Sequence, residues 1–343
     1  MAIVKNLRAI FAEVPTGYVE PGKHVTIDES QTIDPDKVQL DGGFLVKTLV
    51  LSIDPYMRGK MRDPSQKSYS PPFERGEPLY GYGIAVVLRS ENSAIQTGDH
   101  LYCRTLRYEE YSVYKDASAF RALQNVGVPW TLYVGVLGMP GQTAYYGWKE
   151  YSAAQKGETV FVSTAGGAVG SLVVQLAKRD GLKVIASAGS DEKVAFAREC
   201  GADVSFNYKV EDTNDILARE GGIDIYFDNV GGKQLESALE HAHDRARFIE
   251  CGMASIYNNP EAYTPKNLMR IVQSELRVFG LLVFRLADKY QDEFFQVMPR
   301  LVKDGQIKFK EEIVYGLDKV GQAILDVGTG ANSGKVVVIV SEE

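Results

Sequence analysis

Residues 159–178 read TVFVSTAGGAVGSLVVQLAK, and this stretch decides the fold. A short apolar run at 159–163 predicts a strand, and a glycine-rich turn follows it. After the turn, four apolar residues recur at the spacing of one helix face and predict a helix over 168–181: Val169, Leu172, Val173 and Leu176. A strand, a tight turn and a helix in this order open a βαβ unit of a parallel sheet.

Strand-like and helical segments continue to alternate as far as residue 251. Further strands are predicted at 183–187, 203–206, 223–228 and 247–251. Ser190 predicts the start of one helix that runs through Cys200 and stops at Gly201, and apolar spacing predicts another helix around 235–242. This alternation predicts an α/β fold built on a doubly wound parallel (Rossmann) sheet with right-handed crossovers.

The chain on either side of this region has a different character. Eight of the 13 prolines precede residue 79, and none lies between Gly141 and Asn259. Because proline interrupts regular elements, the first part of the chain is expected to be irregular and rich in turns. A mixed, mainly β domain is predicted from strand-like runs at 46–53, 84–88, 112–114 and 336–340. We expect the C-terminal segment to rejoin the N-terminal domain, so that 1–130 and 305–343 form one domain and 131–304 forms the inserted Rossmann domain.

Size and charge exclude several classes of protein. The chain has 343 residues, which suggests about two domains. Its 38 Lys and Arg against 45 Asp and Glu give a net charge of −7 without a basic block, so no nucleic-acid or membrane partner is expected. The charge-free stretch 122–148 contains two prolines and five glycines, which favours a bent, buried segment over a membrane span. Three distant cysteines indicate a reducing compartment, and the protein is expected to be soluble and cytoplasmic.

The glycine-rich turn predicts a dinucleotide site. Residues 165–170 read AGGAVG, a relaxed form of the G-x-G-x-x-G pattern. Glycines in such a turn permit a tight bend, a close approach to a pyrophosphate and close packing of helix on strand. The following helix presents free N–H groups and a partial positive charge to the phosphates. The residues predicted to contact the cofactor here are Gly166, Gly167, Ala168, Val169 and Gly170.

The end of the second strand indicates which dinucleotide is bound. Residues 186–190 read ASAGS, without the acidic residue that usually holds the ribose hydroxyl of NAD. A 2′-phosphate requires hydroxyl donors and a cation, and the small residue Gly189 leaves room for it. The groups predicted to bind that phosphate are those of Ser187, Ser190, Lys193 and Tyr208. Asp191 and Glu192 are expected to be solvated charges in the first turn of a helix. NADPH is therefore favoured over NADH.

Eight segments together resemble one known family. They read LSIDPYMR at 51–58, LGMPGQTAY at 137–145, GGAVGS at 166–171, AGSDEK at 188–193, FNY at 206–208, FDNVGG at 227–232, CGM at 251–253 and NSGK at 332–335. They span nearly the whole chain and resemble the zinc-independent medium-chain dehydrogenase/reductases. Within that group the chain is most similar to the NADPH-dependent alkenal/enone double-bond reductases of the leukotriene hydroxydehydrogenase and prostaglandin reductase branch.

The resemblance implies an architecture and a set of site residues. It implies a GroES-like catalytic domain split around the Rossmann domain, and a homodimer. Lys193 and Tyr208 would hold the 2′-phosphate, and Tyr56 and Tyr257 would face the substrate. The residues that would line the cofactor are Met139, Thr143, Asn229, Cys251 and Asn332. Gln142 stands where relatives often have Met, and residues 108–111 read YEEY where an aromatic residue such as Trp often begins the run, so the substrate preference is open.

The residue types favour reduction without a metal. A catalytic zinc needs thiolate and imidazole ligands, and the sequence offers no spare cluster of Cys and His. We therefore expect hydride transfer from NADPH to the β-carbon of an α,β-unsaturated aldehyde or ketone, with Tyr56 and Tyr257 as the catalytic candidates. Tyr257 follows the turn after the fifth strand, where ligands collect. An NADPH:quinone oxidoreductase is the main alternative. A zinc-free carbonyl reductase and a nucleotide-binding protein with little turnover are the others.

Overall fold

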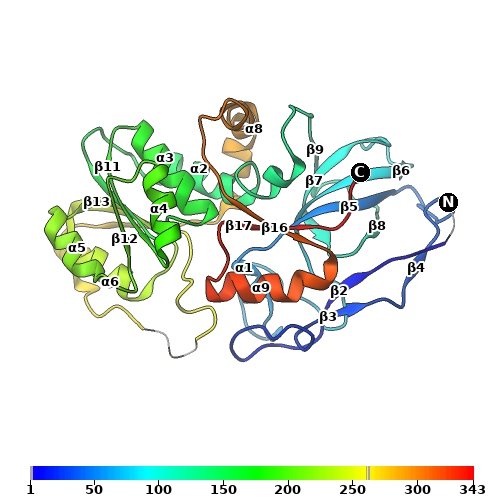
Figure 1. Cartoon of the computed structure of the whole chain (residues 1–343), viewed down its shortest axis with the longest axis horizontal. Coiled ribbons are helices and arrows are strands. Elements are labelled where there is room, and N and C mark those ends of the chain that lie inside the picture. The colour runs from blue at the N-terminus through cyan, green and yellow to red at the C-terminus, as the bar shows by residue number, and fades with distance from the viewer. Residues whose placement is uncertain (1–2, 260, 262) are drawn as a thin grey trace. The chain divides into compact units, whose positions relative to one another are not determined.

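The computed structural model describes residues 3–259, 261 and 263–343. The chain divides into two units (Figure 1). The first unit combines Met1–Gly135 with Glu311–Glu343, and the second unit is Val136–Lys310. The predicted boundaries, 130/131 and 304/305, lie a few residues earlier in the chain. Segment 131–134 stays with the first unit because the Ser52 hydroxyl donates to the Val134 carbonyl oxygen (3.2 Å) and the Thr131 hydroxyl donates to Glu311 (3.1 Å).

The first unit is a mixed, mainly antiparallel β structure. Its largest sheet has the order β16-β17-β5-β6-β7-β9, and β8 also pairs with β5. These strands are β5 (Phe44–Ser52), β6 (Tyr80–Ser90), β7 (His100–Arg107), β8 (Tyr111–Tyr114), β9 (Phe120–Ala122), β16 (Glu311–Tyr315) and β17 (Lys335–Ile339). Two small sheets pair β1 (Val4–Lys5) with β4 (Thr32–Ile33) and β2 (Arg8–Phe11) with β3 (Val25–Asp28). Short helices complete the unit: α1 (Tyr56–Lys60), α9 (Val320–Thr329) and the 3₁₀ turns Trp130–Val134 and Leu317–Lys319.

The C-terminal strand rejoins the N-terminal part of the chain, as predicted. β17 pairs antiparallel with β5, with Val338 opposite Leu51. Both residues are completely buried, and they belong to one hydrophobic core together with residues of α1 and α9. The long run VVVIV therefore forms a strand that is covered on both faces, which explains why it lacks alternating polar residues.

The second unit is a parallel, doubly wound sheet. Its order is β12-β11-β10-β13-β14-β15, and every neighbouring pair is parallel. The strands are β10 (Thr159–Val162), β11 (Lys183–Ala188), β12 (Val204–Asn207), β13 (Ile223–Asp228), β14 (Ala242–Glu250) and β15 (Arg277–Gly280). The helices are α2 (Met139–Tyr151), α3 (Ala168–Arg179), α4 (Asp191–Glu199), α5 (Thr213–Glu220), α6 (Gly232–Glu240), α7 (Met269–Gln273) and α8 (Ala287–Lys303), with a 3₁₀ turn at Val283–Arg285. The predicted fold class is confirmed.

Most predicted elements of this unit are present, with one clear error. The helix predicted to run to Ala242 ends at Glu240, because Ala242 begins β14 and pairs with Ile223. The apolar spacing of Ala242 therefore reflects strand pairing and not a helix face. Ser190 caps α4 as predicted, since its hydroxyl accepts a hydrogen bond from the Lys193 backbone N–H at 3.4 Å. Stacked rings fill the core under β10 and β13, with Phe161 and Tyr226 at 4.9 Å between centroids.

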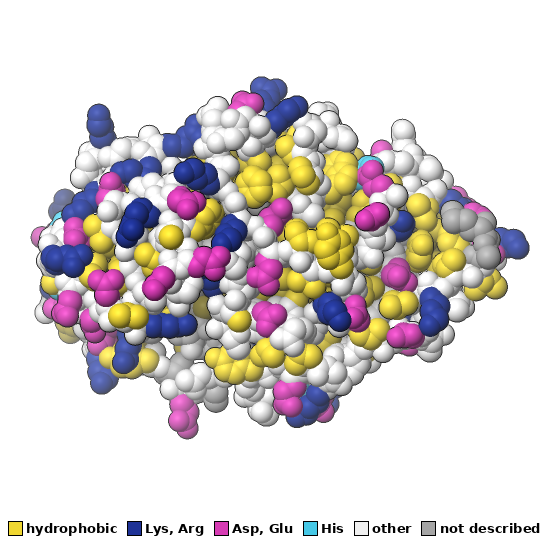
Figure 2. Space-filling view, viewed as in Figure 1, with side chains coloured by type: hydrophobic (Ala, Val, Ile, Leu, Met, Phe, Trp, Pro, Cys, Tyr) yellow, Lys and Arg dark blue, Asp and Glu magenta, His cyan; other side chains and the backbone are white. Residues whose placement is uncertain are grey.

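Charged side chains are interspersed over the molecular face seen in Figure 2. Lys and Arg alternate with Asp and Glu on that face, in keeping with the small net charge. Among the residues described, no helix has both the length and the apolar character needed to cross a bilayer.

Candidate cofactor and active site

The glycine turn connects β10 to α3 in the second unit. A Cβ atom at Gly166 would lie 2.5 Å from the Lys193 Cβ, and a Cβ atom at Gly170 would lie 2.5 Å from the Thr164 carbonyl oxygen. Both distances are far below a normal contact, so these positions require glycine. Thr164 adopts a φ of 55°, and its carbonyl accepts a hydrogen bond from the Gly167 N–H at 2.9 Å. The turn is therefore held rigidly against the strand and the helix.

The first turn of α3 is open to a ligand. Gly167 precedes the helix, and within the described residues no side chain caps its N–H groups. Gly167, Ala168 and Val169 are partly exposed, whereas Gly166 and Gly170 are buried. Uncapped N–H groups and the helix dipole at this end favour an anion such as a pyrophosphate. The local geometry that the glycine pattern predicted is present.

Lys193 lies against this turn, and Tyr208 lies beside Gly189, just after β11. The Lys193 stem packs on Gly166, and the Tyr208 hydroxyl lies 3.2 Å from the position of a Cβ at Gly189. The Lys209 Cε lies 3.5 Å from that same position, so a second lysine is near Gly189. Tyr208 is 41% exposed. A cation and a phenol therefore flank the end of β11, where Ala188 supplies no carboxylate.

Three other residues of this region have definite positions. Ser187 is completely buried and donates its hydroxyl to the Gln234 side-chain oxygen at 2.6 Å. Asp191 and Glu192 are exposed in the first turn of α4, as predicted. Asp191 accepts a hydrogen bond from Asn207, and Glu192 pairs with Lys310.

The carboxyl ends of β13 and β14 bring Asn229, Cys251 and Tyr257 close to one another. The Asn229 N–H donates to the Ser163 hydroxyl (2.8 Å), and its side-chain amide donates to the Ser163 carbonyl oxygen (2.7 Å). The Cys251 N–H donates to the Asp228 carbonyl oxygen at 2.9 Å. The Tyr257 hydroxyl accepts from the Met253 N–H at 3.2 Å. Burial raises the pKa of the Cys251 thiol to about 12, so this thiol stays protonated at neutral pH.

The structure adds Asp228 and Ser163 to this group. The Asp228 Oδ1 accepts hydrogen bonds from the Tyr226 hydroxyl (2.8 Å), from the Val230 N–H (2.8 Å) and from the Gly231 N–H (2.9 Å). The Ser163 hydroxyl lies 3.2 Å from the same oxygen. Asp228 thus fixes the turn that follows β13. An Asp at the last position of a strand, before Asn-Val-Gly-Gly, is the sequence signal that could have identified it.

Met139 and Thr143 lie on the first turns of α2. The Thr143 hydroxyl donates to the Met139 carbonyl oxygen at 2.7 Å and lies 3.4 Å from the Met139 sulfur. Gln142, between them, is 6% exposed, and its side-chain nitrogen has no hydrogen-bond partner among the described residues. This end of α2 therefore carries one thioether and one buried amide donor.

Two other predicted site residues, Tyr56 and Asn332, lie in the first unit. Tyr56 begins α1, and its hydroxyl lies 3.2 Å from the position of a Cβ at Gly81. Burial, and next the Asp54 carboxylate, raise the pKa of Tyr56 well above its usual value, so the phenol keeps its proton. Asn332 donates its side-chain amide to the Gly334 carbonyl oxygen at 2.6 Å.

Asp54, beside Tyr56, is anchored in the core of the first unit. The Ser52 hydroxyl donates to its carboxylate at 2.5 Å, and the Lys335 ammonium lies 3.3 Å away. Asp54 and Lys335 are both about 95% buried or more. The turn that precedes Tyr56 is thus fixed by an ion pair with the C-terminal strand.

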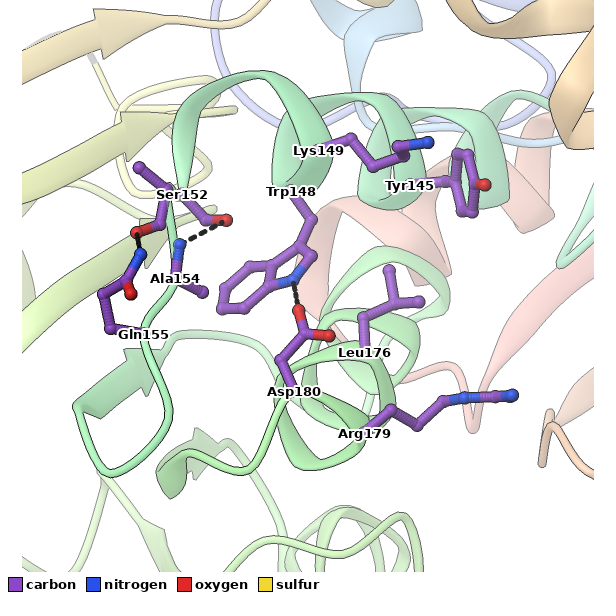
Figure 3. Close-up of a pocket in the computed structure, with 10 residues that line it drawn as sticks. Tyr145, Trp148, Lys149, Ser152, Ala154, Gln155, Leu176, Arg179 and Asp180 are labelled. Carbon is purple, nitrogen blue, oxygen red and sulfur yellow. Dashed lines mark hydrogen bonds between the residues drawn. The ribbon is translucent and has the colours of Figure 1, made fainter.

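A groove of about 570 Å³ lies on α2 and α3, away from the glycine turn (Figure 3). Trp148 lies at its centre and donates its indole N–H to Asp180 at 2.8 Å. None of the residues predicted to bind cofactor or substrate lines this groove. This groove is therefore separate from the residues predicted to bind cofactor or substrate.

Comparison with known proteins gives two family matches. The family described as zinc-binding dehydrogenase matches residues 168–303, and the family described as the N-terminal domain of oxidoreductase matches residues 8–122. The first description names zinc, but within the described residues no group of three or more His, Cys, Asp and Glu side chains could hold a metal ion. The residues do not fit a zinc site, and no step through a metal is derived.

Similar proteins match over nearly the whole chain. A 2-alkenal reductase (NADP(+)-dependent) from Nicotiana tabacum is 40% identical over 99% of both chains. A (+)-pulegone reductase from Mentha piperita is 38% identical, covering 88% of this chain and 89% of the relative. The crystal structure of CurA in complex with NADPH from Vibrio vulnificus has a TM-score of 0.89 and 30% identity, covering 98% of this chain and all of that one.

Proposed function

Because this chain belongs to the NADPH-dependent alkenal and enone reductases of the medium-chain dehydrogenase/reductase family, we propose that it reduces the C=C bond of α,β-unsaturated aldehydes and ketones. The observation that carries this proposal is that Lys193 packs on Gly166 of the glycine turn and Tyr208 lies beside Gly189, just after a strand end without a carboxylate. The similarity to a named 2-alkenal reductase and a named pulegone reductase supports the substrate class.

The second unit holds the cofactor in this proposal. Bound NADPH supplies the hydride that the β-carbon of the substrate accepts. The N–H groups at the start of α3 hold the pyrophosphate, and Lys193 and Tyr208 hold the 2′-phosphate. The remaining contacts that we propose within this unit come from Met139, Thr143, Asn229 and Cys251. Ser187, whose hydroxyl donates to Gln234, remains a predicted contact at the end of β11.

Tyrosine hydroxyls stabilise the transition state in this proposal. Addition of hydride at the β-carbon places negative charge on the carbonyl oxygen of the substrate. A hydrogen-bond donor aimed at that oxygen lowers the barrier, and loss of one such donor costs about 3–4 kcal/mol in related chemistry. Tyr257 and Tyr56 are the proposed donors. The raised pKa of Tyr56 keeps its proton available for this role.

A homodimer is part of the proposal. β15 is at the end of its sheet, and in the described part of the chain it pairs only with β14. Large apolar side chains on and before this strand are strongly exposed, namely Leu268, Met269, Val272 and Val278. An exposed strand edge beside apolar side chains favours pairing with a second copy. Light scattering on the purified chain tests this, with a monomer as the contrary result.

We also propose a reducing compartment, such as the cytoplasm. All three cysteines are free thiols: Cys103, Cys200 and Cys251. Burial raises the pKa of each of them, to about 11 for Cys103 and about 12 for the other two, which keeps them in the thiol form.

A substrate panel tests the proposed function. Purified protein is incubated with 2-alkenals, cyclic enones and quinones, each with NADPH and with NADH, and the products are identified. We expect saturated aldehydes and ketones, with NADPH preferred. Hydroquinones as the sole products would support quinone reduction instead, and allylic alcohols would support carbonyl reduction. If no substrate causes oxidation of NADPH, the result would support the alternative of a nucleotide-binding protein with little turnover.

A further inference from the structure

Glu250 is a buried carboxylic acid that the proposed chemistry does not use. It is the last residue of β14, and its register partner on β13 is Asp228. In a parallel pair, register partners project from the same face of the sheet. Its partner on the other side, on β15, is Gly280, which has no side chain. Glu250 therefore has one polar neighbour across the sheet, and that neighbour is another acid.

The hydrogen bonds of the two acids are unequal. The Oδ1 atom of Asp228 accepts from Tyr226, Val230 and Gly231, and it also lies beside the Ser163 hydroxyl. The Oδ2 atom of Asp228 and both carboxyl oxygens of Glu250 are buried and have no hydrogen-bond partner among the described residues. Two ionised carboxylates cannot hydrogen-bond to each other, but a carboxylic acid can donate to a carboxylate. A single proton between the two acids gives the Asp228 Oδ2 atom and one Glu250 oxygen a hydrogen-bond partner.

We propose that Glu250 donates a shared proton to Asp228, and that this acid pair positions the Asn229–Gly231 turn for cofactor binding. The proposal rests on the cofactor role of Asn229 given above. Asp228 is the ionised member, because the donors around Oδ1 stabilise its charge. Glu250 has no such donors and is the protonated member.

A continuous chain of hydrogen bonds connects this proton to the cofactor turn. The Ser163 hydroxyl donates to the Asp228 carboxylate, and the Ser163 hydroxyl oxygen accepts a hydrogen bond from the Asn229 N–H. The Asp228 carbonyl oxygen accepts from the Cys251 and Gly252 N–H groups, and the Asn229 carbonyl oxygen accepts from the Ala254 N–H. Loss of the shared proton would leave two adjacent buried negative charges under this turn. Their repulsion would loosen both Asn229 and Cys251.

The neighbouring titratable groups do not change charge in the same pH range. Burial, and next the Asp228 carboxyl, raise the pKa of Glu250 to about 9. Burial raises the pKa of Tyr226 well above its usual value and that of Cys251 to about 12. Burial also raises the pKa of Asp228, in keeping with a proton held by the pair. The pair is therefore the group expected to titrate first as the pH rises.

Glu250→Gln and Glu250→Leu separate positioning from simple packing. Glutamine keeps the size and an N–H donor but never ionises, whereas leucine leaves the Asp228 Oδ2 atom without a donor. NADPH affinity is measured by fluorescence titration without substrate. For the wild-type chain we expect affinity to fall roughly tenfold between about pH 8 and about pH 10, and Glu250→Gln is expected to remove this fall. Glu250→Leu is expected to bind NADPH more weakly at neutral pH, with the exposed Glu211→Gln as the matched control.

Infrared spectroscopy of the cofactor-free protein supplies the second readout. We expect a carbonyl stretch of a protonated carboxylic acid at neutral pH, absent in Glu250→Gln and lost from the wild type at alkaline pH. If this band is missing at neutral pH, or if wild type and Glu250→Gln have the same pH profile for NADPH binding, the proposal is wrong. A chain that shows the band but binds no NADPH at any pH would contradict the cofactor role and leave the shared proton supported.

Discussion

Lys193 packs its stem directly on Gly166, so closely that a Cβ atom at Gly166 would lie 2.5 Å from the Lys193 Cβ. Lys193, the proposed phosphate ligand on α4, and the glycine turn before α3 therefore hold each other in place. A side chain at Gly166 would displace both the turn and the lysine. This contact explains why glycine is required at position 166, which is a variable position of the relaxed pattern, in addition to Gly167 and Gly170.

Gly166→Ala is expected to weaken NADPH binding strongly. The added methyl group must displace Lys193, which moves its ammonium group away from the 2′-phosphate. We expect Kd for NADPH to rise by about tenfold or more, in line with about 1.4 kcal/mol per factor of ten. Fluorescence titration measures this change. Gly59→Ala is the control, because a Cβ atom at Gly59 meets nothing within 4 Å, and equal affinity of the two variants would contradict the argument.

Lys193→Ala is expected to change cofactor preference. A hydrogen bond to a charged group contributes about 1.5–3 kcal/mol, which corresponds to roughly a tenfold to hundredfold rise in KM for NADPH. KM for NADH, which has no 2′-phosphate, is expected to change little. Steady-state kinetics with both cofactors provides the measurement. The exposed Lys156→Ala serves as control, and similar effects of Lys193→Ala on both cofactors would refute the 2′-phosphate role.

Tyr257→Phe is expected to lower kcat without weakening NADPH binding. Removal of a donor aimed at the developing charge reduces the rate by about a hundredfold to a thousandfold in related reactions. The nearby Tyr263→Phe is the control, because the Tyr263 hydroxyl donates to Glu236 and not to the proposed site. An unchanged kcat in Tyr257→Phe would remove this residue from the mechanism.

Glu250 is expected to make stability depend on pH. Its pKa in the folded chain is about 9, against 4.5 when unperturbed, so between these values the folded chain holds a proton that the unfolded chain has released. The free energy of unfolding therefore falls as the pH rises through this window, because the unfolded state binds fewer protons. Glu250→Gln lacks this dependence. Urea denaturation from about pH 5 to about pH 9 should show the variant gaining stability relative to wild type, and parallel curves would contradict the raised pKa.

The regular part of the second unit was predictable because its sequence pattern is local. The apolar run of β10, the glycine turn and the apolar face of α3 lie within twenty consecutive residues, and Ser190 marks the start of α4 by its own chemistry. Ala242 was assigned wrongly because its strand character comes from pairing with Ile223, nineteen positions away in the chain. A pattern confined to one segment does not contain that information.

Features of the site that depend on contacts between strands could not be predicted. Nothing in the local sequence indicates that Ser187 faces Gln234 or that Glu250 lies beside Asp228. The first contact depends on how α6 packs against β11, and the second depends on strand order and register. The pairing of Asp54 with Lys335, across most of the chain, is a further example. The sequence predicts Tyr56 as a catalytic candidate. It does not indicate the buried Asp54–Lys335 ion pair that fixes the turn before Tyr56.

Isotope transfer tests the central claim most directly. The purified chain is incubated with a 2-alkenal and NADPH that carries deuterium at the transferable position, and the product is analysed by mass spectrometry and NMR. The account predicts a saturated aldehyde with the deuterium on its β-carbon. An allylic alcohol with the deuterium on the former carbonyl carbon would contradict it.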